Sequence, residues 1–535
     1  MVRVGSGGVR RNNVPSPRHF TFTTWHQHGG LFRRQTDIIT ALLGVSVVML
    51  YSAYFMNLTG YPGQTTTYKK TPDHQKQPGS LANSNTIDDL RKDSKLSILP
   101  QNNTSADNTA KPVVIAHVVS LIKCAEATSV TGFLDAAAVL RHSIHKTSVH
   151  TIDPQTFQPV SKYSYQMYAI VHAENCANHA RGLAGLGYTT LMRHNPVNRS
   201  DIINESYRHF VQYENCCGLD EFIKLYAYTL LDHPISVHWD MDVLVMQPLD
   251  ELYDSMLYDK DSPQGQAARA NLHLSYPLQP LPDRIDAFYT KDVTSSQPWE
   301  MRQGVQGGFL VARPSLEIFQ KYKDFITEGD YIKGRGNGFG WGGLGFGGFQ
   351  GAMAYQGATA YMYDIIYPGH AVPLNPCIYN QVVADVLWRG PHAMEFHMQC
   401  RQYPHEGYTF TNNTIEYSAC QDCRITPVAD TKTVHYTACK KPWECIDPKP
   451  RRPRDKAHVY RLENLTNRTT CHLLFAEWFR TRREFEQLLA RAVEPATAEG
   501  QFLPDAFLGY CKKRWKYIPM VPPPEGFDVN SLYGM

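Results

Sequence analysis

The stretch His238-Trp239-Asp240-Met241-Asp242-Val243-Leu244-Val245 places two carboxylates one residue apart in an apolar run. The run predicts a buried strand over Val237 to Val245. Side chains at positions i and i+2 of a strand share a face, so we expect Asp240 and Asp242 to point into one site. Two such oxygen ligands suit Mn²⁺ or Mg²⁺. Taken alone, however, Asp-x-Asp more often marks a strand-end turn with solvated acids. The neighbouring motifs therefore decide between such a turn and a metal site.

Strands and helices alternate along the chain before this stretch. Apolar, β-branched runs predict strands, and helical spacing predicts helices, at Val113 to Val119 (strand), Phe133 to Ile144 (helix), Tyr165 to His172 (strand), Tyr188 to Met192 (strand) and Asp220 to Leu231 (helix). This order predicts an α/β fold with a mostly parallel sheet and helices on its faces. Ligands of such sheets bind at the carboxyl ends of strands, where Val119-Ser120 and Asp240 both lie.

A second motif lies far downstream, at Val434-His435-Tyr436-Thr437-Ala438-Cys439-Lys440-Lys441-Pro442-Trp443. The imidazole of His435 can complete a metal site begun by two carboxylates. Lys441 can neutralise a diphosphate leaving group, and a divalent cation that bridges a pyrophosphate is what a sugar-nucleotide enzyme needs. Taken alone, His435 would more often be a structural histidine, and Lys441 a solvated surface charge. Together with the Asp pair, they predict a site for a metal and a diphosphate.

These motifs resemble glycosyltransferase family 8, the glycogenin-like retaining enzymes with a GT-A fold, from about Val113 to Trp443. Lys224-Leu225 stands where the family carries Lys-Leu on the helix before Asp-x-Asp, and Pro248 to Tyr253 resembles the segment that follows. The late motif matches the family's His-Phe-x-Gly-x-x-Lys-Pro-Trp, with Ala438 in place of the glycine. Two segments depart from the family: Gln306-Gly307-Gly308 replaces Asn-x-Gly, and Phe349-Gln350-Gly351 replaces Asp-Gln. Because of these departures, the resemblance does not identify the transferred sugar or the way in which the acceptor is bound.

The resemblance implies a role for each matching residue. Asp240, Asp242 and His435 would ligate Mn²⁺ or Mg²⁺, and Asp240 would also contact the nucleotide ribose. The remaining contacts would be made by Lys441 to the diphosphate, by Lys224 and Gln350 as catalytic residues at the nucleotide sugar, and by Val118, Val119 and Ser120 to the uridine. The resemblance therefore implies a hexosyl or pentosyl glycosyltransferase, which moves a sugar from a UDP-sugar to a glycan or glycoprotein acceptor with retention of configuration.

Two other functions stay open. One is a GT-A transferase of another family that uses a GDP-sugar, such as an α-mannosyltransferase, which shares Asp-x-Asp but typically lacks the late motif. The other is a catalytically silent glycan-binding protein, which the altered positions at Gln306 and Phe349 permit. Nucleic acid is not an expected partner, because the net charge is only +3 and the charges are interspersed.

The N-terminal region predicts a membrane anchor. Ile38 to Met56 is a run of 19 residues without a charge, roughly 28 Å as a helix. Only Asp37 opposes the arginines before it, which are Arg3, Arg10, Arg11, Arg18, Arg33 and Arg34. The positive-inside rule therefore predicts a cytosolic tail at residues 1–37, a single type II anchor and a lumenal remainder, as in Golgi membrane enzymes. A cleaved signal peptide is the alternative.

A lumenal location also agrees with the modification signals. Asn-x-Ser/Thr sequons begin at Asn57, Asn102, Asn103, Asn198, Asn204, Asn412, Asn464 and Asn467, all beyond the apolar run. All 12 cysteines lie beyond it too, and in an oxidising lumen they favour disulfides. Cys420-x-x-Cys423 leaves a zinc site as a weaker alternative, because no second Cys-x-x-Cys accompanies it.

The lumenal part divides by composition. Residues 57–111 are polar and predict a flexible stem, residues 112–446 form the predicted GT-A domain, and residues 447–535 form an extension with an amphipathic helix at Leu473 to Ala492. Gly334 to Gly351 is rich in glycine and aromatic residues. We expect a mobile lid there, with Phe339, Trp341, Phe346 and Phe349 offering faces on which a sugar can stack. A low-complexity surface insertion is the alternative.

Overall fold

The computed structural model describes residues 111–124, 130–214, 217–275, 280–292, 302–382, 423, 426–437, 441–445, 470–493, 500–512 and 516–535. The predicted cytosolic tail, membrane anchor and all but the last residue of the predicted stem lie outside these residues. Among the residues that are described, no helix combines the length and the apolar character needed to cross a membrane.

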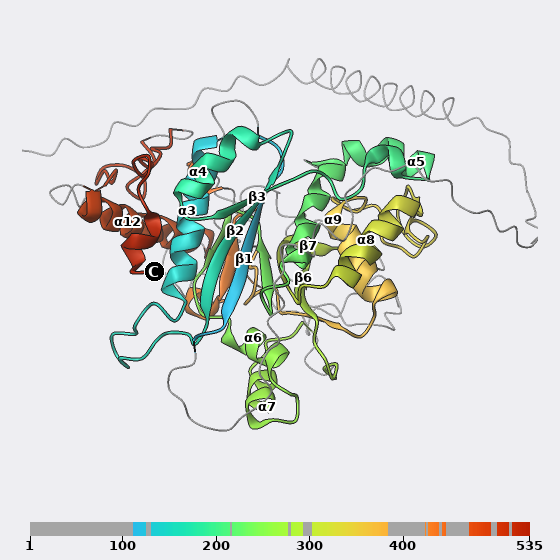
Figure 1. The fold of residues 1–535 in the computed structure, drawn as a ribbon, viewed down its shortest axis with the longest axis horizontal. Coiled ribbons are helices and arrows are strands. Elements are labelled where there is room, and N and C mark those ends of the chain that lie inside the picture. Colours follow the sequence, from blue (N-terminus) through green and yellow to red (C-terminus); the bar gives the residue numbers. More distant parts are fainter. Residues whose placement is uncertain are drawn as a thin grey trace, which may run out of the picture. The chain divides into compact units, whose positions relative to one another are not determined.

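The core of the described chain is a seven-stranded mixed sheet with the order β10-β6-β7-β4-β1-β2-β3 (Figure 1). Its strands are β1 (Val114–Leu121), β2 (Ser164–His172), β3 (Thr189–Arg193), β4 (Ser236–Trp239), β6 (Ala287–Lys291), β7 (Val305–Ala312) and β10 (Ala371–Pro373). Strand β7 pairs antiparallel with β4 and β6, and the other neighbours pair in parallel. The predicted α/β class and mostly parallel sheet are confirmed, whereas β7 as an antiparallel strand inside the sheet was not predicted.

Helices cover both faces of the sheet, because the strands alternate between two apolar sides. Ile115 and Val119 of β1 pack in the core that also contains α3 (Val130–Lys146), while Ala116 and Val118 pack against the 3₁₀ helix η4 (Gly218–Thr229). The other main helices are α4 (Ala180–Gly185), α5 (Glu205–Phe210), α6 (Asp250–Leu257), α7 (Pro263–Ala270), α8 (Leu316–Glu328), α9 (Tyr355–Tyr361) and α12 (Thr470–Val493). Short 3₁₀ and π turns complete the described part: η1 (Ala177–His179), η2 (Arg199–Asp201), η3 (Val211–Tyr213), η5 (Met362–Ile366), η8 (Val428–Asp430), η9 (Pro442–Glu444) and η10 (Val529–Tyr533).

The two carboxylates of Asp-x-Asp lie in a turn. Strand β4 ends at Trp239 and a separate strand, β5 (Val243–Val245), begins after Asp242. The prediction of one strand from Val237 to Val245 is therefore wrong. Strand β5 leaves the large sheet and pairs antiparallel with β11 (Thr433–His435). The turn between β4 and β5, and not the alternation of a strand, sets the directions of the two side chains.

The glycine-rich segment is a folded part of the core. It contains β9 (Gly340–Trp341), which pairs antiparallel with β8 (Tyr331–Ile332). Trp341, Phe346 and Phe349 are buried in the apolar cluster beneath α8 and α9. A Cβ atom on Gly340, which has a φ of +76°, would lie 2.1 Å from the carbonyl carbon of Phe346, so only glycine fits there. The prediction that these three aromatic rings offer faces to a sugar is wrong. The surface-insertion alternative is wrong for the part from Gly340 to Phe349 that holds them, whereas Phe339 is 37% exposed.

The C-terminal extension packs directly on the late motif. The hydroxyl of Tyr436 donates to the Leu474 carbonyl of α12 at 2.6 Å, and Trp443 lies beside Trp478 with ring centroids 6.0 Å apart. Below them, Arg482 is fully buried, donates to Glu486 at 2.9 Å and lies 3.7 Å from Asp135 of α3. The predicted amphipathic helix is confirmed, and its contact with Tyr436 stabilises the strand that carries His435.

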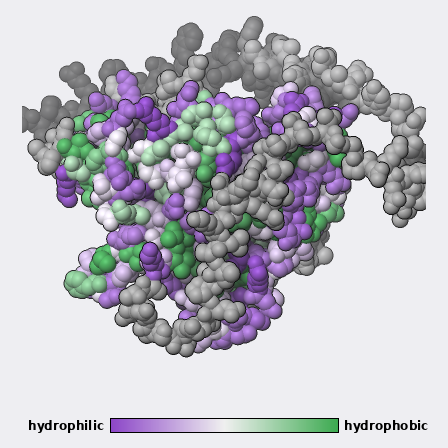
Figure 2. All heavy atoms as spheres, in the orientation of Figure 1, coloured by the Kyte–Doolittle hydropathy of each residue, from purple (hydrophilic) through white to green (hydrophobic). Residues whose placement is uncertain are grey.

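Disulfides join segments that are distant in the sequence. Cys124 pairs with Cys176, Cys377 with Cys423, and Cys445 with Cys511. The prediction of disulfides is confirmed for these pairs, and the pairing of Cys423 removes it from the alternative zinc site. Cys445 follows the late motif directly, so its disulfide ties this motif to the extension. On the face drawn in Figure 2, hydrophilic and hydrophobic side chains of the described residues are interspersed, in agreement with the interspersed charges of the sequence.

Candidate metal centre

Three chain segments meet at the carboxyl end of β4. The backbone N–H of Asp240 donates to the Gly308 carbonyl at 3.0 Å, which fixes the end of β4 against the start of β7. Strand β11 runs beside β5 with His435 opposite Val243. The N–H of Tyr436 then donates to the Asp242 carbonyl at 2.9 Å. These backbone contacts bring a histidine from the late motif next to the Asp-x-Asp turn.

The ligand atoms of Asp240, Asp242 and His435 all lie within 4.8 Å of one another. His435 Nε2 is 3.3 Å from Asp242 Oδ1 and 3.7 Å from Asp240 Oδ2. The side chains of His435 and Asp242 are buried, whereas that of Asp240 is 32% exposed, so the cluster opens to solvent on the Asp240 side. Two carboxylates and an imidazole form a donor set that fits Mn²⁺ or Mg²⁺ and leaves coordination positions for phosphate oxygens.

Lys224 supports the cluster from η4. Its ammonium donates to Asp240 Oδ1 at 3.0 Å, to Glu221 Oε1 at 3.1 Å and to the Gly307 carbonyl at 3.1 Å. Burial by itself would lower the pKa of Lys224, but the Asp240 and Glu221 carboxylates outweigh it and raise the pKa above its usual value. Lys224 therefore carries its charge at neutral pH and holds Asp240 in place.

The protonation states suit a cation site. Burial would raise the pKa of Asp240, but Lys224 and then His435 outweigh burial and lower this pKa to about 2. Burial lowers the pKa of His435 below its usual value, and the nearby Asp240 offsets this only in part. At neutral pH, Asp240 is therefore ionised and the imidazole is neutral, and these are the forms that bind a metal ion.

Lys441 contacts the cluster at Asp242, where its ammonium forms an ion pair with Asp242 Oδ2. Burial lowers the pKa of Lys441 to about 8, although the Asp240 and Glu444 carboxylates act in the opposite direction. Its side chain is 31% exposed. The cluster thus carries a partly exposed cation beside the two carboxylates.

The other residues implied by the resemblance lie on β1 (Val118, Val119 and Ser120) and at the end of the glycine-rich segment (Gln350). Val118 and Val119 are fully buried, whereas Ser120 is half-buried and its Oγ lies 3.1 Å from His238 Nε2. Gln350 is exposed, and its carbonyl accepts from Gln356 Nε2 at 3.1 Å. The structure therefore brings the metal, diphosphate and lysine residues together and leaves the side chain of Gln350 at the surface.

Three residues that the sequence did not single out for this cluster complete it. Gln306 contacts His435 through its side-chain oxygen, at 3.1 Å. Gly308 lies so close that a Cβ atom there would be 2.3 Å from His435 Cε1 and 3.0 Å from Asp240 Oδ2. Glu221 is 4% exposed and holds Lys224. The Gln-Gly-Gly pattern before β7 was a usable signal for the first two, because paired glycines often mark a close approach of backbone to another group.

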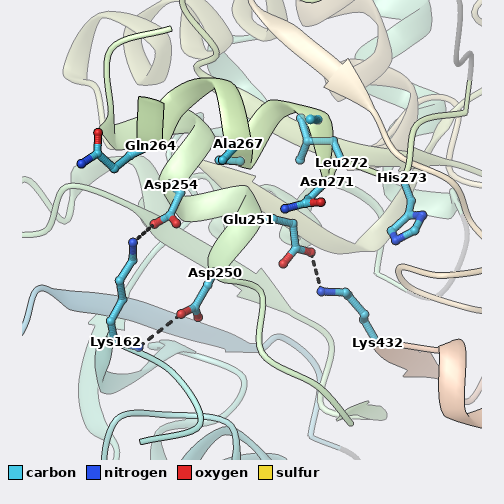
Figure 3. A pocket seen from close by; sticks show the side chains of 12 residues that line it. Lys162, Asp250, Glu251, Asp254, Gln264, Ala267, Asn271, Leu272, His273 and Lys432 are labelled. Atoms are coloured by element: carbon cyan, nitrogen blue, oxygen red, sulfur yellow. Dashed lines mark hydrogen bonds and ion pairs between the residues drawn. The ribbon is translucent and has the colours of Figure 1, made fainter. Parts of the chain in front are cut away.

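A second, polar pocket of about 700 Å³ lies between α6, α7 and Lys432 (Figure 3). Lys162, just before β2, reaches it from the amino end of that strand. Two ion pairs line it: Lys162 Nζ lies 2.8 Å from Asp254 Oδ1, and Lys432 Nζ lies 2.8 Å from Glu251 Oε1. A third carboxylate of the lining, Asp250, accepts from Ser161 Oγ at 2.6 Å. The pocket contains none of the residues of the metal cluster.

No protein-family model and no curated protein matches this chain. Comparison with solved structures finds similarity to glycosyltransferases. Mouse xyloside xylosyltransferase 1 in its apo form is 10% identical, with 60% of this chain and 97% of that chain covered, at a TM-score of 0.31. The galactosyltransferase LgtC, solved with donor and acceptor sugar analogues, is 13% identical, with 66% and 96% covered, at a TM-score of 0.30. Similarities this low assign neither a family nor a reaction to the chain.

Proposed function

We propose that this protein is a metal-dependent glycosyltransferase that moves a sugar from a UDP-sugar to a glycan or glycoprotein acceptor. The convergence of Asp240, Asp242 and His435 within 4.8 Å carries the proposal. Two of these residues come from the turn after β4, the third comes from β11, and the lysine of the late motif accompanies them. The motifs that resemble glycosyltransferase family 8 thus form one site, as a diphosphate chemistry requires.

Each residue of the site has a distinct task in this proposal. A Mn²⁺ or Mg²⁺ ion bound by Asp240, Asp242 and His435 would supply Lewis-acid stabilisation of the diphosphate. Lys441 places a second positive charge where negative charge develops on the departing UDP. Lys224 keeps Asp240 ionised and oriented through the contact at 3.0 Å. The acceptor oxygen would bond to the anomeric carbon as the bond from this carbon to the UDP oxygen breaks, and the hydroxyl proton would pass to the departing diphosphate. Retention of configuration is what the family resemblance implies.

The experiment is a donor screen with the full-length protein. UDP-sugars and GDP-sugars are incubated with the protein and Mn²⁺, and release of free nucleotide is measured with and without EDTA. We expect release from one or more UDP-sugars that EDTA abolishes. Release from GDP-sugars alone would favour the α-mannosyltransferase alternative. Absence of release from every donor, together with retained binding to immobilised glycans, would favour the silent glycan-binding alternative.

A matched pair of variants links the activity to the cluster. Asp242→Asn replaces a ligand oxygen with a neutral amide and should abolish the EDTA-sensitive release. Asp283→Asn removes an exposed aspartate that pairs with Lys260, far in sequence from the cluster, and should leave the release unchanged. Equal activity of the two variants would contradict the assignment of the metal site.

We also propose a single-pass type II topology in the Golgi membrane, with the catalytic domain in the lumen. The charge pattern around residues 38–56 and the sequons beyond it support this topology. In sealed microsomes, protease should remove only the N-terminal tail, and glycosidase should lower the mass of the protected remainder. Digestion of the whole chain without detergent would contradict the topology.

A further inference from the structure

The orientation of the Gln306 amide is fixed by a backbone contact. Gln306 is 7% exposed and lies near the start of β7. Its Oε1 atom accepts a hydrogen bond from the backbone N–H of Gly308 at 2.7 Å. A backbone N–H can only donate, so the atom that faces it must be the amide oxygen and not the amide nitrogen. Asn380 Nδ2, which also donates to Thr290 Oγ1 at 2.9 Å, donates to the same oxygen at 3.1 Å.

This oxygen determines which nitrogen of His435 carries the proton. His435 Nδ1 lies 3.1 Å from Gln306 Oε1. If Nδ1 held a lone pair, two acceptors would face each other in a buried place, at the cost of an unsatisfied polar contact. Nδ1 therefore carries the proton and donates to Gln306. In a neutral imidazole, the other nitrogen, Nε2, then holds the lone pair.

The lone pair on Nε2 points toward the two carboxylates, at 3.3 Å from Asp242 and 3.7 Å from Asp240. An acceptor atom that faces two anionic oxygens is unfavourable unless a cation lies among them. Hydrogen bonds that fix the tautomer and the ring orientation of a metal-ligating histidine are a general requirement of such sites. Gln306 meets this requirement here.

We propose that Gln306 is a positioning residue of the metal centre, which holds the proton on His435 Nδ1 and so presents the Nε2 lone pair to the divalent cation. This inference rests on the proposed function, in that the cluster binds a cation. The inference assigns a role to Gln306, a position at which the chain departs from glycosyltransferase family 8 and which left the identity of the transferred sugar open. Because the Gln306 amide contacts His435, Gln306 influences substrate binding and turnover only through the bound metal ion.

The first test measures the dissociation constant of Mn²⁺ by electron paramagnetic resonance of the free ion. Gln306→Met removes the acceptor at similar length and should weaken Mn²⁺ binding about 10- to 100-fold. Gln306→Glu keeps an acceptor for Nδ1–H and should bind Mn²⁺ at least as tightly as the wild type. Gln266→Met is the control, because Gln266 lies on α7 and its amide donates to the Asp261 carbonyl of the same segment at 3.2 Å. It should leave the dissociation constant unchanged.

The second test reads the tautomer directly. The ¹⁵N shifts of the His435 imidazole, assigned by comparison with His435→Gln, are recorded in EDTA-treated protein. We expect a protonated Nδ1 in the wild type and in Gln266→Met, and loss of this preference in Gln306→Met. A protonated Nε2 with an unprotonated Nδ1 in the wild type would overturn the inference.

The outcomes separate this inference from the proposed function. Wild-type Mn²⁺ affinity in Gln306→Met, combined with loss of binding in Asp242→Asn, would overturn the role of Gln306 and leave the metal centre standing. Absence of Mn²⁺ binding by the wild type would overturn both.

Discussion

The ammonium of Lys441 forms an ion pair with the carboxylate of Asp242 across a sequence separation of 199 residues. The pair joins the late motif to the Asp-x-Asp turn, and the pairing of β11 with β5 holds the two segments in register. Because the same carboxylate belongs to the metal cluster, the proposed function assigns Lys441 to the diphosphate beside a cation bound there. The geometry thereby brings together two motifs whose joint site the sequence predicted from their chemistry and from the resemblance.

Replacement of this lysine should affect the nucleotide more than the metal. Lys441→Ala removes a positive charge from the diphosphate position, so we expect UDP affinity and turnover to fall by about 10- to 100-fold, or about 1.4–2.7 kcal/mol. Mn²⁺ binding in the absence of nucleotide should persist, since all three ligands remain. Isothermal titration with Mn²⁺ and then with UDP measures both. Unchanged UDP affinity and turnover would show that the late lysine is structural.

Gly308 should tolerate no side chain. In Gly308→Ala, the new Cβ would lie 2.3 Å from His435 Cε1, so the histidine must move out of the cluster. We expect loss of Mn²⁺ binding and of metal-dependent activity, with near-native circular dichroism. The control is Gly185→Ala, where no atom lies within 4 Å of the added Cβ, and wild-type metal affinity is expected there. Equal affinity in both variants would mean that His435 is not a ligand.

The C-terminal extension should be essential for stability. Trp478 is fully buried in α12 and packs beside Trp443 of the late motif. Trp478→Ala leaves a large cavity and should lower the free energy of unfolding by about 3–5 kcal/mol. Urea denaturation, monitored by circular dichroism, measures this loss. A change below about 1 kcal/mol, the size typical of a surface substitution, would contradict the packing of α12 on the late motif.

Stability should fall on mild acidification because of buried histidines. Burial, followed by the charge of His233, lowers the pKa of His117 to about 3, whereas an unfolded histidine has a pKa near 6.5. Below pH 6.5 the unfolded chain thus binds more protons, and His117 removes about 1.4 kcal/mol of stability per pH unit down to its folded pKa. Denaturation at pH 7.5 and pH 5.5 should show a smaller loss for His117→Asn than for the wild type.

Asp135 acts in the opposite direction and supplies the control. Burial raises its pKa to about 6, although Arg482 opposes the shift. The folded state therefore binds the extra proton between pH 6 and the unfolded pKa near 3.9, and this residue stabilises the fold as the pH falls. Asp135→Asn should consequently enlarge the loss between pH 7.5 and pH 5.5. Identical losses in the wild type and both variants would contradict these assignments.

The sequence predicted those features that depend on local pattern. Periodicity located β1, β2, β3, α3 and α12 to within a few residues, because each has one or two apolar faces that bury in the core. It failed at Asp240 to Asp242, since an apolar run does not reveal that the chain leaves one sheet and joins another. The prediction from sequence failed also at Trp341 and Phe346. The glycine-rich composition suggested a mobile lid there, but both rings are buried in the apolar core. Gln306 was noticed only as a departure, because its contact with His435 depends on a distant strand.

The central claim is that Asp240, Asp242 and His435 together hold a divalent cation. Anomalous diffraction at the manganese edge, from crystals of the protein grown with Mn²⁺ and UDP, tests it most directly. The account predicts one strong anomalous peak within coordination distance of Asp242, His435 Nε2 and Asp240, with the UDP diphosphate between the ion and Lys441. A bound UDP with no anomalous peak among these three side chains, or with the manganese at a different site, would contradict it.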